Sequence, residues 1–213
     1  MSKKYSGKLI VFEGIDGCGK STQLKLTSQW LQALNFPVLE TKEPTEAFNI
    51  RELVNNNNYT DITELFLFLA DRAEHVNTLL LPALEDGNIV LCDRYYPSTY
   101  AYQNCLPLDE LKKLNDIATN GLQSDLIIWL HTTRNISQKR LARREFLDKY
   151  EIKEQVEIEQ NYKNQYFEYE KITDKHGDRF LWTCIVGDSE KHIVQNNIRT
   201  VITSRVLNYM INI

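Results

Sequence analysis

The segment with the strongest chemical signal reads Gly14-Ile15-Asp16-Gly17-Cys18-Gly19-Lys20-Ser21 and fits the pattern G-x-x-x-x-G-K-[ST]. Glycines let the backbone wrap closely round a phosphate, and the amide N–H groups and the N-terminus of a following helix attract its charge. Lys20 supplies a cation, and Ser21 offers an oxygen to Mg²⁺. The alternative is a glycine-rich turn with a chance Lys-Ser pair, but an apolar run precedes the segment and a helical stretch to Leu34 follows it. This context predicts a nucleotide-binding loop.

A second polar pair, Asp93-Arg94, comes directly after the apolar run 89–92. If that run is a strand of an open parallel sheet, its carboxyl end faces the same crevice as the glycine-rich loop. A carboxylate there can hold hydrated Mg²⁺, and an arginine can grip an acceptor phosphate or the transferring group, because its planar fork matches phosphate oxygens. The alternative for the pair is a surface ion pair that ends a strand.

The elements that must position these residues alternate along the chain. Apolar runs at 9–12, 38–39, 89–92, 126–130 and 180–185 are candidate strands, and amphipathic patterns, clearest at 62–84, 136–144 and 152–172, are candidate helices. Such alternation is typical of an α/β protein whose sheet carries helices on both faces. Because no internal repeat or linker divides the chain, we predict a single domain over residues 1–213.

Composition excludes several classes of partner. The 25 basic and 29 acidic residues give a net charge of −4, which repels a polyanion, so we expect no nucleic acid partner. Glu13 and Asp16 interrupt the first apolar run, so we expect no signal peptide and no membrane segment there. The four cysteines are widely spaced without a C-x-x-C pair, which favours reduced thiols and a cytoplasmic location over a zinc site or disulfides.

A phosphate-binding loop does not by itself name a reaction, because GTPase switches, motor ATPases and small-molecule kinases share it. A GTPase would normally carry an Asn-Lys-x-Asp string that reads guanine, and the sequence contains none. The pattern therefore favours the other classes over a GTPase switch.

Four motifs resemble those of thymidylate kinases. They are Phe12-Glu13-Gly14-Ile15-Asp16-Gly17-Cys18-Gly19-Lys20-Ser21-Thr22, Thr41-Lys42-Glu43-Pro44, Thr63-Glu64-Leu65-Phe66-Leu67-Phe68-Leu69-Ala70-Asp71-Arg72, and Asp93-Arg94-Tyr95 with Ser98-Thr99-Tyr100-Ala101-Tyr102-Gln103. The resemblance spans nearly the whole chain, and four motifs in order are more specific than one. It implies the P-loop nucleoside monophosphate kinase fold, a five-stranded parallel sheet flanked by helices on both faces, with a lid. It also implies transfer of the γ-phosphoryl group of ATP to thymidine monophosphate (dTMP), with Mg²⁺, to give the diphosphate used in dTTP synthesis.

The resemblance implies that Phe68 stacks on the thymine ring and that Arg72 hydrogen-bonds the base. Their spacing supports this, because residues four apart lie on one face of a helix. The alternative for Phe68 is core packing within the apolar run 65–69.

Further contacts of the acceptor follow from the same resemblance. Asp16 would meet the sugar 3′-hydroxyl, and Tyr102 would crowd out a ribose 2′-hydroxyl. Ser98 and Gln103 would contact the base or sugar. Arg51 would reach the acceptor phosphate, and its alternative is an exposed charge on a helix.

The family carries a catalytic arginine either in the P-loop or in the lid. Here Gly17 occupies the loop position, so the lid, at about residues 140–152, would have to provide it. Arg144 is the first candidate and Arg143 the second. Arg140, one turn earlier, would flank the adenine or its phosphates.

The sequence departs from the family pattern in two places. Lys149 stands where the bacterial pattern often has arginine, and Thr45-Glu46-Ala47 replaces a glycine pair after Glu43-Pro44. Pro44 itself resembles a family proline found in the cis form. The resemblance also implies a homodimer packed through helices.

The sequence thus predicts a kinase in which Lys20, Arg94 and a lid arginine stabilise the transferring group, with Ser21 and Asp93 around Mg²⁺. The alternatives are a kinase for another deoxynucleoside or nucleotide, which would need a different base pocket, and a non-catalytic nucleotide-binding switch. The switch would bind ATP without acceptor-dependent turnover.

Overall fold

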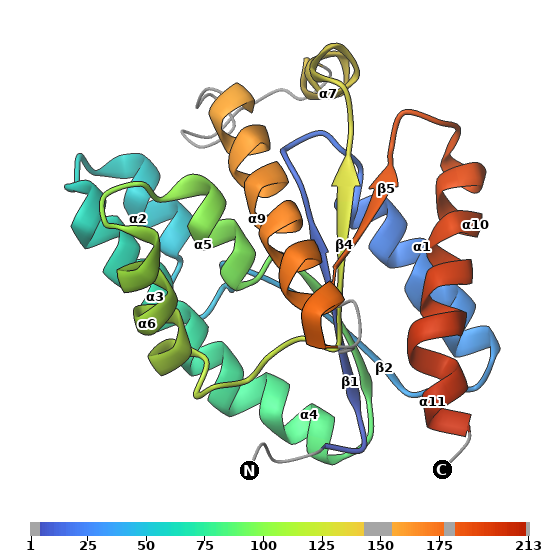
Figure 1. Ribbon diagram of the computed structural model, residues 1–213. Coiled ribbons are helices and arrows are strands. Elements are labelled where there is room, and N and C mark those ends of the chain that lie inside the picture. The colour runs from blue at the N-terminus through green and yellow to red at the C-terminus, as the bar shows by residue number, and fades with distance from the viewer. Residues whose placement is uncertain (1–4, 143–154, 177–181, 212–213) are drawn as a thin grey trace.

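The computed structural model describes residues 5–142, 155–176 and 182–211 (Figure 1). Its centre is a five-stranded sheet in the order β2-β3-β1-β4-β5, with every neighbouring pair parallel. The strands are β1 (Lys8–Glu13), β2 (Val38–Lys42), β3 (Ile89–Asp93), β4 (Leu126–His131) and β5 (Trp182–Val186). The predicted α/β fold with a five-stranded parallel sheet is therefore confirmed.

Strands β1, β3 and β4 form because they contain continuous apolar runs, which suit a sheet that helices cover on both faces. From Leu9 to Phe12 and from Ile89 to Cys92, every residue is 0% exposed. Within the described residues, no helix combines the length and hydrophobicity that a transmembrane span needs. All four cysteines are described, and none forms a disulfide.

Helices cover both faces of the sheet (Figure 1). Helices α1 and α10 pack together on one side, and α4 and α9 pack against the other side, where α5 lies beside α9 and α3 beside α6. Two π-helical turns, Val76–Leu80 and Thr203–Leu207, join α3 to α4 and α10 to α11. The helices are α1 (Lys20–Ala33), α2 (Ile50–Asn56), α3 (Asp61–His75), α4 (Leu81–Glu85), α5 (Tyr96–Tyr102), α6 (Leu108–Ala118), α7 (Arg134–Leu141), α9 (Gln155–His176), α10 (Lys191–Ile202) and α11 (Asn208–Ile211).

The two faces of α3 have different surroundings. Leu65 and Leu69 are buried in a small apolar cluster with Leu111 of α6. Phe68 and Arg72 are also four residues apart, on a neighbouring stripe of the same helix. Packing of the leucines against α6 therefore fixes the direction in which this second stripe faces.

The carboxyl ends of β2, β3 and β1 lie side by side. Asp93 at the end of β3 is opposite both Phe12 and Lys42 in the register of the sheet. The backbone N–H of Arg94 donates to the carbonyl of Phe12 at 3.0 Å, and that of Glu43 donates to the carbonyl of Asp93 at 3.0 Å. The segments that follow these three strands consequently meet at one edge of the sheet.

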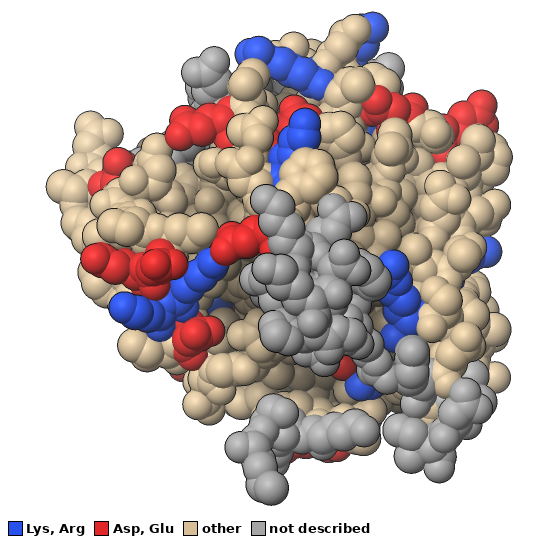
Figure 2. Space-filling view, in the orientation of Figure 1, with Lys and Arg blue, Asp and Glu red and all other residues tan. Residues whose placement is uncertain are grey.

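Basic and acidic side chains are interspersed on the face drawn in Figure 2. This face has no extended region of a single sign among its described atoms.

Candidate nucleotide-binding site

The glycine-rich segment forms the turn between β1 and α1. Gly14, Gly17 and Gly19 have φ angles of 139°, 79° and 106°, a region that favours glycine. A Cβ atom at Gly14 would lie 2.5 Å from the carbonyl oxygen of Leu130, and one at Gly17 would lie 2.6 Å from that of Ser137. The glycines thus permit both the turn and its close approach to β4 and α7.

Lys20 is the first residue of α1 and is 6% exposed. Its ammonium group donates to the carbonyl oxygens of Gly14 at 3.0 Å and Ile15 at 3.1 Å, so the charge lies within the turn. The side chains of Ile15 and Cys18 are buried in the main core. These two positions therefore offer only their backbone to a ligand.

Ser21 and Asp93 come together although they are far apart in the sequence. The Ser21 hydroxyl donates to Asp93 Oδ2 at 2.6 Å. A hydroxyl and a carboxylate are the oxygen ligands that Mg²⁺ accepts, and Mg²⁺ usually completes its shell with water and substrate phosphates. The described residues contain no group of three or more His, Cys, Asp or Glu side chains that could hold a metal. The pair fits Mg²⁺ bound together with a phosphate ligand.

Two cavities open beside this turn, and we name them the loop cavity and the α3 cavity. The loop cavity is lined by Asp16, Gly17, Gly19, Lys20, Ser21, Thr22, Lys42, Glu43, Pro44, Arg51, Asp93, Arg94 and Arg140. The α3 cavity is lined by Asp16, Glu43, Pro44, Arg51, Phe68, Asp71, Arg72, Arg94, Ser98, Thr99, Tyr102 and Gln103. Asp16, Glu43, Pro44, Arg51 and Arg94 line both, so the two cavities meet.

Arg94 lies where the cavities meet. Its backbone has a φ of 74°, and its side chain is turned back toward the glycine-rich turn, where Nη2 lies 2.6 Å from Asp16 Oδ1. Nη1 donates to Ser98 Oγ at 3.2 Å and to the Tyr162 hydroxyl at 3.3 Å. These contacts hold a planar cation at the boundary between the two cavities.

Asp16 is 7% exposed and stays ionised. Burial opposes the charge, but the neighbouring cations of Arg94 and Lys20 and a hydrogen bond from Tyr102 outweigh burial and hold the pKa of Asp16 well below its ordinary value. The Tyr102 hydroxyl donates to Asp16 Oδ2 at 3.0 Å. Asp16 is therefore a charged acceptor fixed at the junction.

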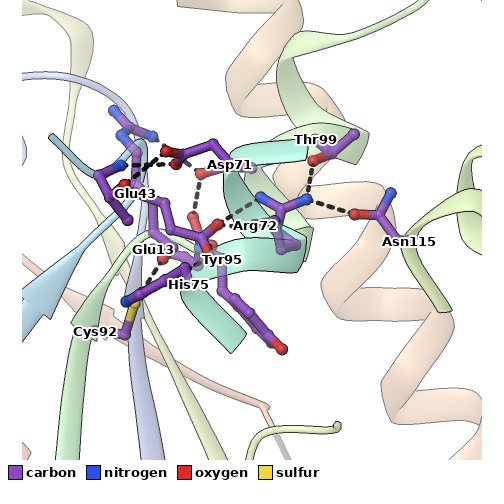
Figure 3. Close-up of polar contacts among 12 residues, drawn as sticks. Glu13, Glu43, Asp71, Arg72, His75, Cys92, Tyr95, Thr99 and Asn115 are labelled. Carbon is purple, nitrogen blue, oxygen red and sulfur yellow. Dashed lines mark hydrogen bonds and ion pairs between the residues drawn. The ribbon is translucent and has the colours of Figure 1, made fainter. Parts of the chain in front are cut away.

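Arg72 is 4% exposed and held in a fixed plane (Figure 3). Its Nε and Nη2 donate to Glu43 Oε2 at 2.8 and 2.7 Å. Nη1 donates to Thr99 Oγ1 at 2.6 Å and to Asn115 Oδ1. Figure 3 shows the guanidinium between Glu43 on one side and Thr99 and Asn115 on the other. Arg72 and Phe68 line the same cavity, as the resemblance to the family implied.

Glu43 belongs to a buried network behind Arg72. Burial opposes its ionisation, but the cation of Arg72 and the hydrogen bond from His75 prevail and lower the pKa of Glu43. Because an ionised carboxylate only accepts, His75 Nδ1 donates to Glu43 Oε1 at 3.0 Å, which leaves Nε2 facing Thr41 Oγ1 at 2.8 Å. The Glu43–Pro44 peptide bond is cis, the form that the resemblance implied for this proline.

Glu13 forms a second buried network beside Arg94. It accepts hydrogen bonds from the Tyr95 backbone at 2.8 Å, from Ser98 Oγ at 2.7 Å and from the Tyr162 hydroxyl at 2.8 Å. Burial raises the pKa of Glu13 even though Arg94 and these donors act in the opposite direction. Ser98 thus serves as a bridge between Glu13 and Arg94 as well as lining the α3 cavity.

Arg140 joins the glycine-rich turn to the segment after β5. Its Nη1 donates to the carbonyl oxygens of Cys18 at 3.1 Å and Gly17 at 3.3 Å, and its Nη2 donates to that of Gly187 at 3.1 Å. Arg140 also lines the loop cavity. Arg143, Arg144 and Lys149 lie outside the described residues.

Of the remaining predicted residues, two line one cavity each and one lines both cavities. Gln103 is buried and lines the α3 cavity, and Thr22 lines the loop cavity. Arg51 is exposed on α2, which agrees with its alternative as a helix charge, yet it lines both cavities.

Sequence reasoning missed Glu43, Asp71 and Thr99 as lining residues and Tyr162 as a contact of Arg94. Three of the four lie within the motifs quoted above. Thr99 precedes Tyr102 by three residues, a spacing that places both on one face of a helix and could have identified it.

A glycine-rich turn that opens into a second cavity, with an arginine at their junction, is the layout of a protein that brings two phosphorylated ligands together. With the strand order and the helices on both faces, it places the chain among P-loop proteins with the nucleoside monophosphate kinase fold.

Comparison with known proteins names the family within this class. The family model described as "Thymidylate kinase" matches residues 12–198, so the chain belongs to the thymidylate kinase family. A protein named "Thymidylate kinase" from Geotalea daltonii is 40% identical over 187 residues, which cover 82% of this chain and 87% of that protein. One from Nostoc sp. is 46% identical over 134 residues, which cover 58% of this chain and 64% of that protein. The chain thus spans just under two thirds of the Nostoc relative.

Proposed function

We propose that this protein transfers the γ-phosphoryl group of ATP to dTMP, with Mg²⁺, to give ADP and thymidine diphosphate. The observation that carries the proposal is the junction of the two cavities at Arg94 and Asp16. Lys20 lies in the cavity on one side, and Phe68 and Arg72 line the cavity on the other. Family membership agrees with this proposal.

The donor binds in the loop cavity. The amide N–H groups of the glycine-rich turn and the N-terminus of α1 face its phosphates, and Lys20 exchanges its contacts with Gly14 and Ile15 for phosphate oxygens. Arg140, which joins the turn to Gly187, would flank the adenine or its phosphates. Ser21 and Asp93 would hold Mg²⁺, which would supply neutralisation of the phosphate charge.

The acceptor binds in the α3 cavity. The Phe68 ring provides an apolar face for the pyrimidine, while Arg72 addresses its edge. The described hydrogen bonds of Arg72 use four of its five N–H groups, which leaves one on Nη2 for a base carbonyl. Asp16 accepts from the sugar 3′-hydroxyl, and Tyr102 occupies the space that a 2′-hydroxyl would need.

The transfer is a direct displacement. An oxygen of the acceptor phosphate attacks the γ-phosphorus of ATP, the bond from that phosphorus to the β–γ bridging oxygen breaks, and ADP leaves with the bond electrons. Lys20 and Arg94 stabilise the charge on the transferring group, and Arg51 orients the acceptor phosphate. Arg144, or Arg143 as second candidate, would approach from the lid.

A panel of nucleoside monophosphates tests this function through ADP release. We expect turnover with dTMP, and we expect the other monophosphates to be poorer acceptors. Turnover with another monophosphate alone would overturn the acceptor, and tight ATP binding without acceptor-dependent turnover would overturn the kinase activity in favour of a switch.

We also propose a cytoplasmic homodimer. The support for the dimer is the outer face of α3 and the turn after it, where Ile62, Phe66 and Leu79 are 38%, 54% and 38% exposed. Light scattering at micromolar concentration tests it, and a monomeric mass would contradict it. The support for the compartment is that the four cysteines, all of which the structure describes, form no disulfide.

A further inference from the structure

The end of β2 and the turn that follows it form hydrogen bonds with one face of α3. Thr41 near the end of β2, and Glu43 and Thr45 in the turn that follows, contact His75, Arg72 and Asp71 respectively. Asp71 and His75 are four residues apart and so lie on one face of α3, and the three contacts join the two segments along their length.

Asp71 provides the last of these contacts. It is 1% exposed, and both of its oxygens accept from Thr45: Oδ2 from the backbone N–H at 2.7 Å and Oδ1 from the hydroxyl at 2.6 Å. The same hydroxyl accepts from the Ala47 backbone N–H at 3.1 Å. Thr45 therefore ties the start of the β2–α2 turn both to α3 and to the turn itself.

The adjacent residue pair Asp71-Arg72 thus holds Pro44 from both sides. Arg72 binds the residue before the proline and Asp71 binds the residue after it. Pro44 lines both cavities, and the turn leads directly into α2, where Arg51 also lines both. Movement of Thr45 would displace the wall between the cavities.

We propose that Asp71, through Thr45, is a positioning residue for the acceptor nucleotide. It fixes the β2–α2 turn relative to Arg72, and so sets the distance between the base-binding end of the α3 cavity and Arg51 at its phosphate end. Thr45-Glu46-Ala47 stands where the family often has a glycine pair, and the side chain of Thr45 supplies a tether that glycine cannot. This inference rests on the proposed function, because it assigns the acceptor to the α3 cavity.

The test compares Thr45→Val with Thr45→Ser. Valine keeps the shape and the backbone N–H but removes the hydroxyl, whereas serine keeps the hydroxyl. We expect the valine variant to raise KM for dTMP about tenfold, the effect of one lost hydrogen bond to a charged group, and to change KM for ATP by less than about twofold. The serine variant should restore the wild-type KM for dTMP.

Glu46→Gln is the matched control, because Glu46 is exposed in the same turn and pairs with Lys42 at 2.9 Å on the surface. It should leave both KM values unchanged. An unchanged KM for dTMP in Thr45→Val, or an equal rise for both substrates, would overturn the inference, since an equal rise indicates general destabilisation.

Hydrogen exchange of the unliganded protein provides a readout that needs no activity. Amides of residues 45–49 should exchange faster in Thr45→Val and in Asp71→Asn than in wild type, and at the wild-type rate in Thr45→Ser. If the wild type shows no turnover of dTMP, the proposed function is wrong. Hydrogen exchange still tests whether the hydrogen bonds between Thr45 and Asp71 hold the β2–α2 turn in place. If the amides of residues 45–49 exchange at the wild-type rate in every variant, Asp71 and Thr45 do not hold this turn in place.

Discussion

The guanidinium of Arg94 lies 2.6 Å from the carboxylate of Asp16, although the two residues follow different strands. Asp16 belongs to the turn after β1, and Arg94 follows β3, which is the neighbour of β1 in the sheet. Because parallel strands end at one edge of a sheet, this topology brings opposite charges together at the junction of the two cavities.

Lys20→Ala should reduce kcat by about 100- to 1000-fold, as expected when one group that stabilises transition-state charge is removed. Lys25 lies on the exposed side of the same helix, so Lys25→Ala is the matched control and should keep wild-type kcat. Steady-state ADP release measures both. A wild-type rate for Lys20→Ala would refute the role of the glycine-rich turn.

Phe68→Ala should lower kcat/KM for dTMP by about 5- to 150-fold, corresponding to the loss of about 1–3 kcal/mol of stacking on a base. Phe167→Ala is the control, because that ring is 45% exposed on α9 and lines neither cavity. If Phe68→Ala and Phe167→Ala behaved alike, Phe68 would be a packing residue and the pyrimidine would lie elsewhere.

Tyr102→Ala should reduce the preference for dTMP over its ribose counterpart, because it opens the space beside Asp16 into which a 2′-hydroxyl would project. Steric rejection of one hydroxyl is limited to about 100-fold, so the preference should fall by up to that factor. Tyr102→Phe keeps the ring and should keep the preference, although it loses the hydrogen bond to Asp16. The ratio of kcat/KM values for the two acceptors measures the effect, and an unchanged ratio in Tyr102→Ala would contradict the assignment.

The Asp16–Arg94 pair should contribute stability that depends on pH. The folded-state pKa of Asp16 is depressed, so its contribution is present above the ordinary carboxyl pKa of about 3.9 and is lost as the pH falls below that value. Wild type should therefore exceed Asp16→Asn in free energy of unfolding near neutral pH, and the difference should narrow below about pH 4. Urea unfolding at a series of pH values measures it. A difference that stayed constant down to about pH 3 would mean that Asp16 is not stabilised in its charged form.

Sequence reasoning succeeded where chemistry is local or follows from sheet geometry. The glycine-rich turn is one contiguous pattern between a strand and a helix, and Asp93-Arg94 was placed beside it by the rule that parallel strands end together. Phe68 and Arg72 required the family resemblance as well, because the sequence pattern alone favours core packing for a ring in an apolar run.

Contacts between distant segments escaped prediction for a physical reason. Asp71 and Thr45 are 26 residues apart, and Tyr162 reaches Arg94 from 68 residues away. Nothing in the pattern of α9 distinguishes Tyr162 from its neighbouring tyrosines, since its role depends on how α9 packs against α5. The pairing of Thr41, Glu43 and Thr45 with α3 likewise emerges only when the helix and the strand are docked.

A crystal structure with dTMP, Mg²⁺ and a non-hydrolysable ATP analogue tests the central claim most directly, through the distances from the Arg94 guanidinium to the two sets of phosphate oxygens. We expect the acceptor phosphate and the γ-phosphate on either side of Arg94, both within hydrogen-bonding distance, with the pyrimidine against Phe68 and Arg72. A pyrimidine bound outside the α3 cavity, or phosphates that do not converge on Arg94, would contradict the account.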